Sequence, residues 1–201
     1  MKGLLIKDFY IIKSVLAIMC VVFLVIGASL SYLATPWVLT VLATVMLGMM
    51  VTTTINVDRS SGWMKTAFTT PVSRKTVIGS KYMMYLLLSA AGLLFGLVFG
   101  SAATAVLGGD MRSAGLYICI SVTMALLSGS VILPACFLLD DGKSILGNIF
   151  AYPLSAGIFV AFSLIMGEGA ATLGVLIGIA VCIFAASWFL AGKVLAKKDI
   201  L

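Results

Sequence analysis

The chain has 201 residues, of which 62% are hydrophobic and only 10% are charged. An average soluble domain carries about 25% charged residues, and a soluble core of this length could not hide so much apolar surface. The composition therefore predicts an all-α integral membrane protein and excludes a soluble domain. The net charge of +6 does not indicate a nucleic-acid partner, because the basic residues cluster beside hydrophobic runs, where they determine topology and face anionic lipid.

The first 14 residues, MKGLLIKDFYIIKS, combine lysines with apolar residues at helical spacing. The apolar residues are Leu5, Phe9, Ile12 and, just beyond, Leu16. Lys2 and Lys13 project near Phe9, and long lysine stems can extend past such a face to water. We therefore expect an interfacial helix over residues 1–14 that leads into the first span.

Six apolar runs follow, each near the roughly 20 residues that a bilayer requires. They are approximately 15–34, 37–57, 82–107, 114–139, 146–167 and 170–192. Of the 13 Lys and Arg residues, all except Arg112 fall on the side of the two termini and of the 58–81 connection. The positive-inside rule therefore predicts a multi-pass protein of the cell membrane with both termini in the cytoplasm, and an even number of spans agrees with this.

The connection from 58 to 81 is the longest polar stretch of the chain. Ser60 and Ser61 can cap a short helix there, and Pro71 would end it. The apolar residues of this short helix fall within one sector. They are Trp63, Met64, Ala67 and Phe68. Two interpretations stay open: a helix that lies in the headgroup layer, or a knob that docks into a cleft on a cytoplasmic protein.

Gly92, Gly96 and Gly100 repeat every four residues in the third run. Small residues at this spacing let helix backbones approach closely. The pattern predicts helix packing either within one copy of the chain or between two copies.

Hydroxyl side chains gather on the second run. Thr40 and Thr44 lie one turn apart, and Thr52 and Asn56 follow toward its cytoplasmic end. Hydroxyls in membrane helices usually bond back to carbonyls of their own helix. The alternative is that these residues line a polar translocation path.

Several function classes lack their required residues. The chain has no histidine, which removes the commonest metal ligand and proton shuttle. Its cysteines lie in apolar runs without a CxxC pair, which is typical of packing residues. Ion-coupled transporters usually need a charged residue deep in a span, and this chain has none there. No Walker A loop for nucleotide binding is present either. We therefore expect no catalytic residue, no metal and no cofactor bound by this chain.

The 58–82 stretch follows the pattern D-x4-W-x-K-x5-P-V-S-R-K-x-V-x3-K-Y. Together with the opening MKGLLIKDFYIIK, this pattern resembles the small permease subunits of ABC-2 type ABC transporters. Phe68 and Thr70 depart from the tyrosine and leucine that the family often has before the proline. The resemblance covers residues 1–201 as a single transmembrane domain.

The resemblance implies that the 58–81 loop holds a coupling helix that inserts into an ATPase subunit. The residues that would carry this contact are Asp58, Arg59, Trp63, Met64, Lys65, Ala67, Phe68, Pro71 and Arg74. Two ATPase subunits, which bind ATP and Mg, would work with two permease copies or a paralogous pair. The path would run between the permeases along their second and fifth spans.

Similar proteins export amphipathic peptides, such as phenol-soluble modulins, or provide immunity to bacteriocins. We therefore expect an exporter of amphipathic or hydrophobic peptides. The rival interpretation is a non-transporting membrane scaffold or sensor that anchors a cytoplasmic partner through the same basic loop.

Overall fold

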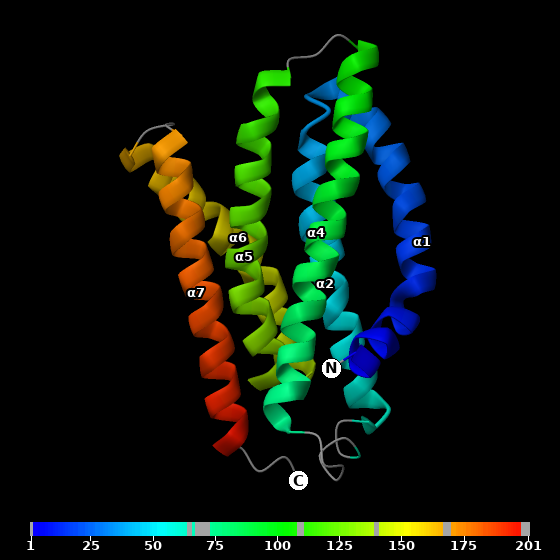
Figure 1. Cartoon of the computed structure of the whole chain (residues 1–201), viewed down its shortest axis with the longest axis vertical. Coiled ribbons are helices and arrows are strands. Elements are labelled where there is room, and N and C mark those ends of the chain that lie inside the picture. Colours follow the sequence, from blue (N-terminus) through cyan, green and yellow to red (C-terminus); the bar gives the residue numbers. More distant parts are fainter. Residues whose placement is uncertain are drawn as a thin grey trace.

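A computed structural model describes the backbone of residues 2–63, 66, 73–107, 111–138, 141–166 and 170–197. All secondary structure in these ranges is helical. The elements are α1 (Lys2–Leu33), α2 (Val38–Ser60), α4 (Arg74–Leu107), the short 3-10 helix η1 (Met111–Ser113), α5 (Ala114–Leu138), α6 (Asp141–Met166) and α7 (Ala170–Lys197). The predicted all-α class is confirmed, and Figure 1 shows the long helices side by side in one bundle.

Five helices, α1, α2, α4, α5 and α7, are long and apolar enough to cross a membrane. In α6 the apolar stretch that the structure describes, Ile149–Ile165, is shorter. The long helices follow the predicted runs in order, and the count of six spans stays a prediction. α1 begins and α7 ends at the same end of the bundle as the α2–α4 connection (Figure 1), as the predicted topology requires. We call this the loop end of the bundle.

α1 is one continuous helix from Lys2 to Leu33, so the structure has no break between the predicted interfacial helix and the first span. Its first turns run obliquely to the rest of the helix (Figure 1). The placement of these turns in the headgroup layer stays a prediction.

α2 packs most extensively against α4 and also contacts α1 and α5. Its buried stripe repeats every four residues, which is the spacing of one helix face. The stripe consists of Leu39, Ala43, Leu47, Val51 and Ile55. α6 and α7 pack on the far side of α5.

The three glycines of α4 face α2. A Cβ atom at Gly92 would overlap the backbone of Ala43, and one at Gly96 would overlap the backbone of Thr40. A Cβ at Gly100 would lie 2.8 Å from the Trp37 ring. The close backbone approach is therefore made within one copy of the chain, between α2 and α4.

Candidate functional site

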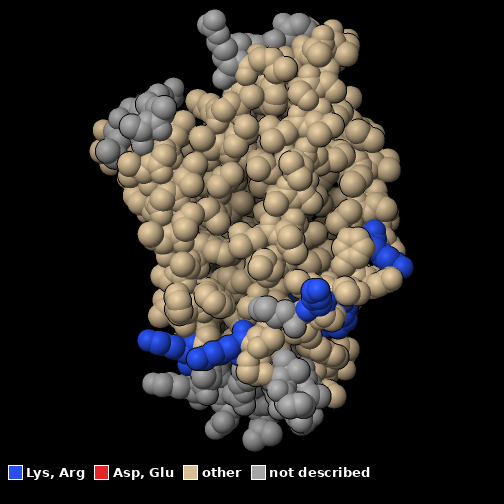
Figure 2. Space-filling model, viewed as in Figure 1, with Lys and Arg blue, Asp and Glu red and all other residues tan. Residues whose placement is uncertain are grey.

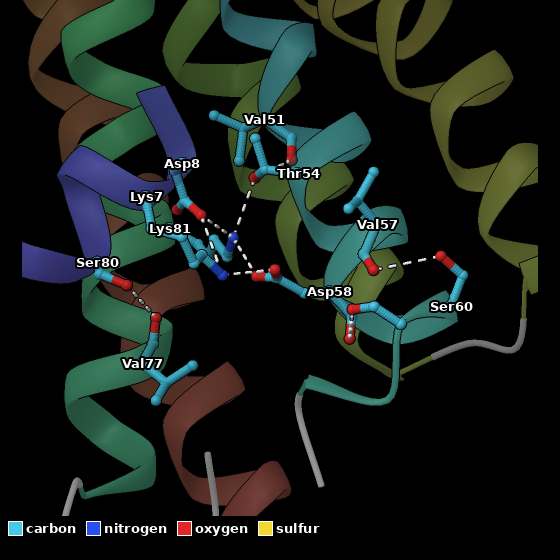
Figure 3. Close-up of polar contacts among 11 residues, drawn as sticks. Lys7, Asp8, Val51, Thr54, Val57, Asp58, Ser60, Val77, Ser80 and Lys81 are labelled. Carbon is cyan, nitrogen blue, oxygen red and sulfur yellow. Dashed lines mark hydrogen bonds and ion pairs between the residues drawn. The ribbon is translucent and has the colours of Figure 1, made fainter. Parts of the chain in front are cut away.

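Four charged side chains from three helices meet at the loop end of the bundle (Figure 3). Lys7 and Asp8 come from α1, Asp58 from α2 and Lys81 from α4. The side chains of Asp8, Asp58 and Lys81 are at most 3% exposed. We call these four residues the ionic cluster.

Lys81 is the centre of the ionic cluster. Its Nζ lies 2.8 Å from Asp8 Oδ1 and 2.6 Å from Asp58 Oδ2, and it donates to Thr54 Oγ1 at 3.0 Å. The Thr54 hydroxyl can accept this bond because its own hydrogen goes to the Val51 carbonyl, 2.8 Å away. An ammonium group has three donors. Two of them make the hydrogen bonds to Asp8 and Thr54, and the ion pair with Asp58 adds a second compensating charge.

Lys7 connects the ionic cluster to the α2–α4 connection. Its Nζ donates to Asp58 Oδ1 at 2.5 Å, and the same Nζ lies 3.4 Å from the centroid of the Trp63 ring. A lysine over a tryptophan face contributes about 0.5–2 kcal/mol, more where water is excluded. The Lys7 side chain is 28% exposed, so this contact lies at the edge of the cluster. Trp63, a predicted docking residue, is thereby tied to α1.

The charges of the ionic cluster balance, with two lysines against two carboxylates. A buried ion pair contributes little net stability over apolar packing, but removing one partner leaves an uncompensated charge and costs about 3–5 kcal/mol. The cluster therefore holds the ends of α1, α2 and α4 in one arrangement. The spacing of Thr54 and Asp58, one turn apart on α2, places both on the same helix face.

Sequence reasoning missed this cluster. It assigned Asp58 to the contact with an ATPase subunit and counted Lys81 among the basic residues that set the topology, and both side chains are buried. The available signal was that Asp58 and Lys81 each lie at the end of an apolar run, that Asp8 precedes the first run, and that their charges can cancel. Charged side chains there can either reach the headgroups or pair with one another, and only the tertiary arrangement distinguishes the two.

The other predicted coupling residues divide into two groups. Arg59 Nη2 donates to the Cys136 carbonyl at 2.5 Å, so it ties the end of α2 to α5. Met64, Lys65, Ala67, Phe68 and Pro71 lie outside the described residues, as does the side chain of Arg74.

A cleft of about 580 Å³ opens in the middle of the bundle between α2, α5 and α6. Its walls are almost wholly apolar. The lining residues are Val41, Leu42, Val45, Met46, Met49, Met124, Ile149 and Tyr152. The Tyr152 hydroxyl is buried, and among the described residues it has no hydrogen-bond partner. The cleft wall can therefore accommodate an apolar group.

The predicted path residues lie elsewhere. Thr40 and Thr44 are buried against α4 and are not part of the cleft wall. Thr44 donates to the Thr40 carbonyl at 2.6 Å and Thr52 to the Met49 carbonyl at 2.8 Å, which is the back-bonding alternative. Asn56 is exposed. The cleft wall uses the side of α2 away from Thr40 and Thr44. Thr52 and Asn56 lie on the same helix face as Val45 and Met49, seven residues further toward the loop end, and are not among the lining residues.

A bundle of long apolar helices with a balanced charge cluster at one end defines a multi-pass membrane protein. A family model described as ABC-2 family transporter protein matches residues 3–195. The chain therefore belongs to the ABC-2 family of transporter proteins. No curated protein and no solved structure matches it.

The family match confirms the resemblance to ABC-2 permeases over nearly the whole chain. Such permeases are membrane components of transporters, are typically not enzymes themselves, and generally work with an ABC ATPase. The finer resemblance to small peptide exporters stays a prediction.

Proposed function

We propose that this chain is the transmembrane permease subunit of an ATP-driven exporter of amphipathic or hydrophobic peptides. The observation that carries the proposal is that one helix, α2, bears both the cleft and part of the ionic cluster. Its residues Val41, Leu42, Val45, Met46 and Met49 line the cleft. Its residues Thr54 and Asp58 join the cluster. A continuous helix transmits displacement along its length, so a shift at the loop end of α2 changes the cleft.

The cleft supports the cargo assignment. A volume of about 580 Å³ lies within the range of roughly 300–1,000 Å³ for ligand sites and suits the side chains of one apolar helix face. Amphipathic helices bind by laying such a face into a groove. Met46, Met49 and Met124 supply polarizable side chains that adapt to different apolar shapes. An ion or a sugar would lose its hydration here without replacement.

The ionic cluster supports the proposed coupling route. Two ATPase subunits would bind the 58–81 loops of two permease copies, identical or paralogous, on the cytoplasmic side. ATP and Mg would be bound by those subunits. Closure of the ATPases would displace the loop, and the Trp63–Lys7 contact and the Asp58 and Lys81 ion pairs would pass the displacement to α1, α2 and α4. The cleft would then open outward between the two permeases.

The test is reconstitution in lipid nanodiscs with ABC ATPase subunits from the same organism. We expect a stable complex whose ATP turnover rises when an amphipathic helical peptide is added, and does not rise with a scrambled peptide of the same composition. Met46→Arg places a charge in the cleft wall and should abolish the peptide response while the complex still forms. Tyr32→Arg, at a residue that is 86% exposed, serves as its control.

The other outcomes separate the alternatives. If the complex forms but no amphipathic peptide changes its ATP turnover, the permease assignment stands and the proposed peptide cargo is wrong. Failure to bind any ATPase would favour the scaffold or sensor.

A further inference from the structure

A second pocket, of about 170 Å³, lies at the loop end between the beginning of α4 and the end of α7. It belongs neither to the cleft nor to the ionic cluster. It is lined by Lys75 and Ile78 of α4 and by Trp188, Phe189, Gly192 and Lys193 of α7. Figure 2 shows that the Lys and Arg side chains of the described residues on the visible face lie in the lower half of the molecule, below a wide surface without charged side chains.

The two lysines of this pocket come from different helices, and both are exposed. Among the described residues neither forms an ion pair with a carboxylate. Two ammonium groups at one concave site attract an anion, and lysine is a common phosphate ligand. Their positive charge is thus available to a ligand.

The remaining lining residues combine polar and apolar contacts. Trp188 offers an indole N–H donor, and tryptophan is enriched at the level of the lipid headgroups. Ile78 and Phe189 are apolar, and the neighbouring Leu190 is 61% exposed. No atom lies within 4 Å of where a Cβ at Gly192 would be, so the glycine keeps the pocket open. A ligand with both a phosphate and hydrocarbon chains satisfies all of these features.

We propose that this pocket binds the headgroup phosphate of an anionic phospholipid and that the lipid bridges α4 and α7. Basic pockets between transmembrane helices on the cytoplasmic side bind anionic headgroups in this way. α4 begins directly after the loop between α2 and α4, so a lipid held there sets the position of that loop relative to α7. Phosphatidylglycerol and phosphatidylcholine are the matched anionic and zwitterionic probes.

The test is lipid binding to the detergent-solubilised protein, measured by native mass spectrometry with each probe. We expect the wild type to prefer phosphatidylglycerol, and the double variant Lys75→Gln/Lys193→Gln to lose about 10- to 30-fold of this affinity, since each lysine near an anionic headgroup contributes about 1 kcal/mol. The double variant Lys2→Gln/Lys13→Gln removes the same charge from exposed positions of α1 and should keep the preference.

Gly192→Leu tests the pocket without changing any charge. It fills space that is empty and improves helix propensity, so it also serves if the double variant fails to fold. We expect it to lose the preference too. Three results would each overturn the proposal. The first is an equal loss of affinity in the α1 control, and the second is unchanged lipid binding by Gly192→Leu. The third is displacement of the lipid by millimolar inorganic phosphate, which would indicate a soluble anion as the ligand.

Discussion

The two sides of α2 make different kinds of interaction, ionic on one side and apolar on the other. One side ends in the ionic cluster, where each contact has a fixed partner, as in the two hydrogen bonds and the ion pair of Lys81. The other side forms the cleft, whose α2 residues are all apolar and interact without direction. The difference suggests a division of labour: the cluster keeps the loop in register with the bundle, and the cleft tolerates cargo of varied shape.

The largest expected effect comes from removing the centre of the ionic cluster. Lys81→Met leaves Asp8 and Asp58 buried with only Lys7, and we expect it to lower the stability by about 3–5 kcal/mol. The measurement is thermal unfolding of the purified protein followed by tryptophan fluorescence. Lys2→Met, which removes an exposed charge, should unfold like the wild type.

A second variant shows whether the charge balance itself matters. Lys81→Met/Asp8→Asn leaves one lysine against one carboxylate, so the double variant should be more stable than Lys81→Met alone. A double variant that is less stable than the single one would show that the bonds, and not the balance of charge, hold the helices.

The next effect concerns the contact that lets α2 move as one body with α4. Gly96→Val would place its side chain on the backbone of Thr40, and overpacking of this kind costs about 1–3 kcal/mol. We expect lower stability and, in the transporter complex, ATP turnover that responds less to peptide. Gly178→Val is the matched control, because nothing lies within 4 Å of its added Cβ.

Separating the loop from the cluster should affect activity more than stability. Trp63→Ala removes the ring that lies on Lys7, a contact of about 0.5–2 kcal/mol, and leaves the four charges in place. We expect thermal unfolding to change little and peptide-stimulated ATP turnover to fall. If Trp63→Ala retains full stimulation with normal ATPase binding, the Trp63–Lys7 contact is not part of the coupling route.

The helices were predictable because their signals are local. An apolar run near the length that a bilayer requires predicts a helix by itself, and the glycine repeat of α4 describes one helix face, which can be read from spacing alone. The ionic cluster could not be predicted, because one of its ion pairs joins Asp8 to Lys81, 73 positions apart. The cleft could not be predicted either, since Val45 and Met46 would suit a lipid-facing wall equally well. Thr40 and Thr44 were more prominent in the sequence, yet both pack on α4. The Thr44 hydroxyl bonds back to its own helix, whereas the Thr40 hydroxyl is buried and has no partner among the described residues.

The smallest expected effect is that of Tyr152→Phe, which should not weaken the free protein but should weaken the binding of peptide. Tyr152 lines the cleft, but its hydroxyl is buried and has no partner among the described residues, so the empty protein bears the cost of its desolvation. Tyr152→Phe should therefore leave the free protein equally stable or slightly more stable. If cargo supplies the missing hydrogen bond, the same variant should bind peptide about 2- to 10-fold more weakly, the equivalent of roughly 0.5–1.5 kcal/mol. Thermal unfolding with and without peptide measures both quantities in one series. Equal affinity for peptide would mean that the cleft recognises its cargo by shape and apolar contact alone, whereas a destabilised free protein would mean that the hydroxyl already has a partner within the bundle.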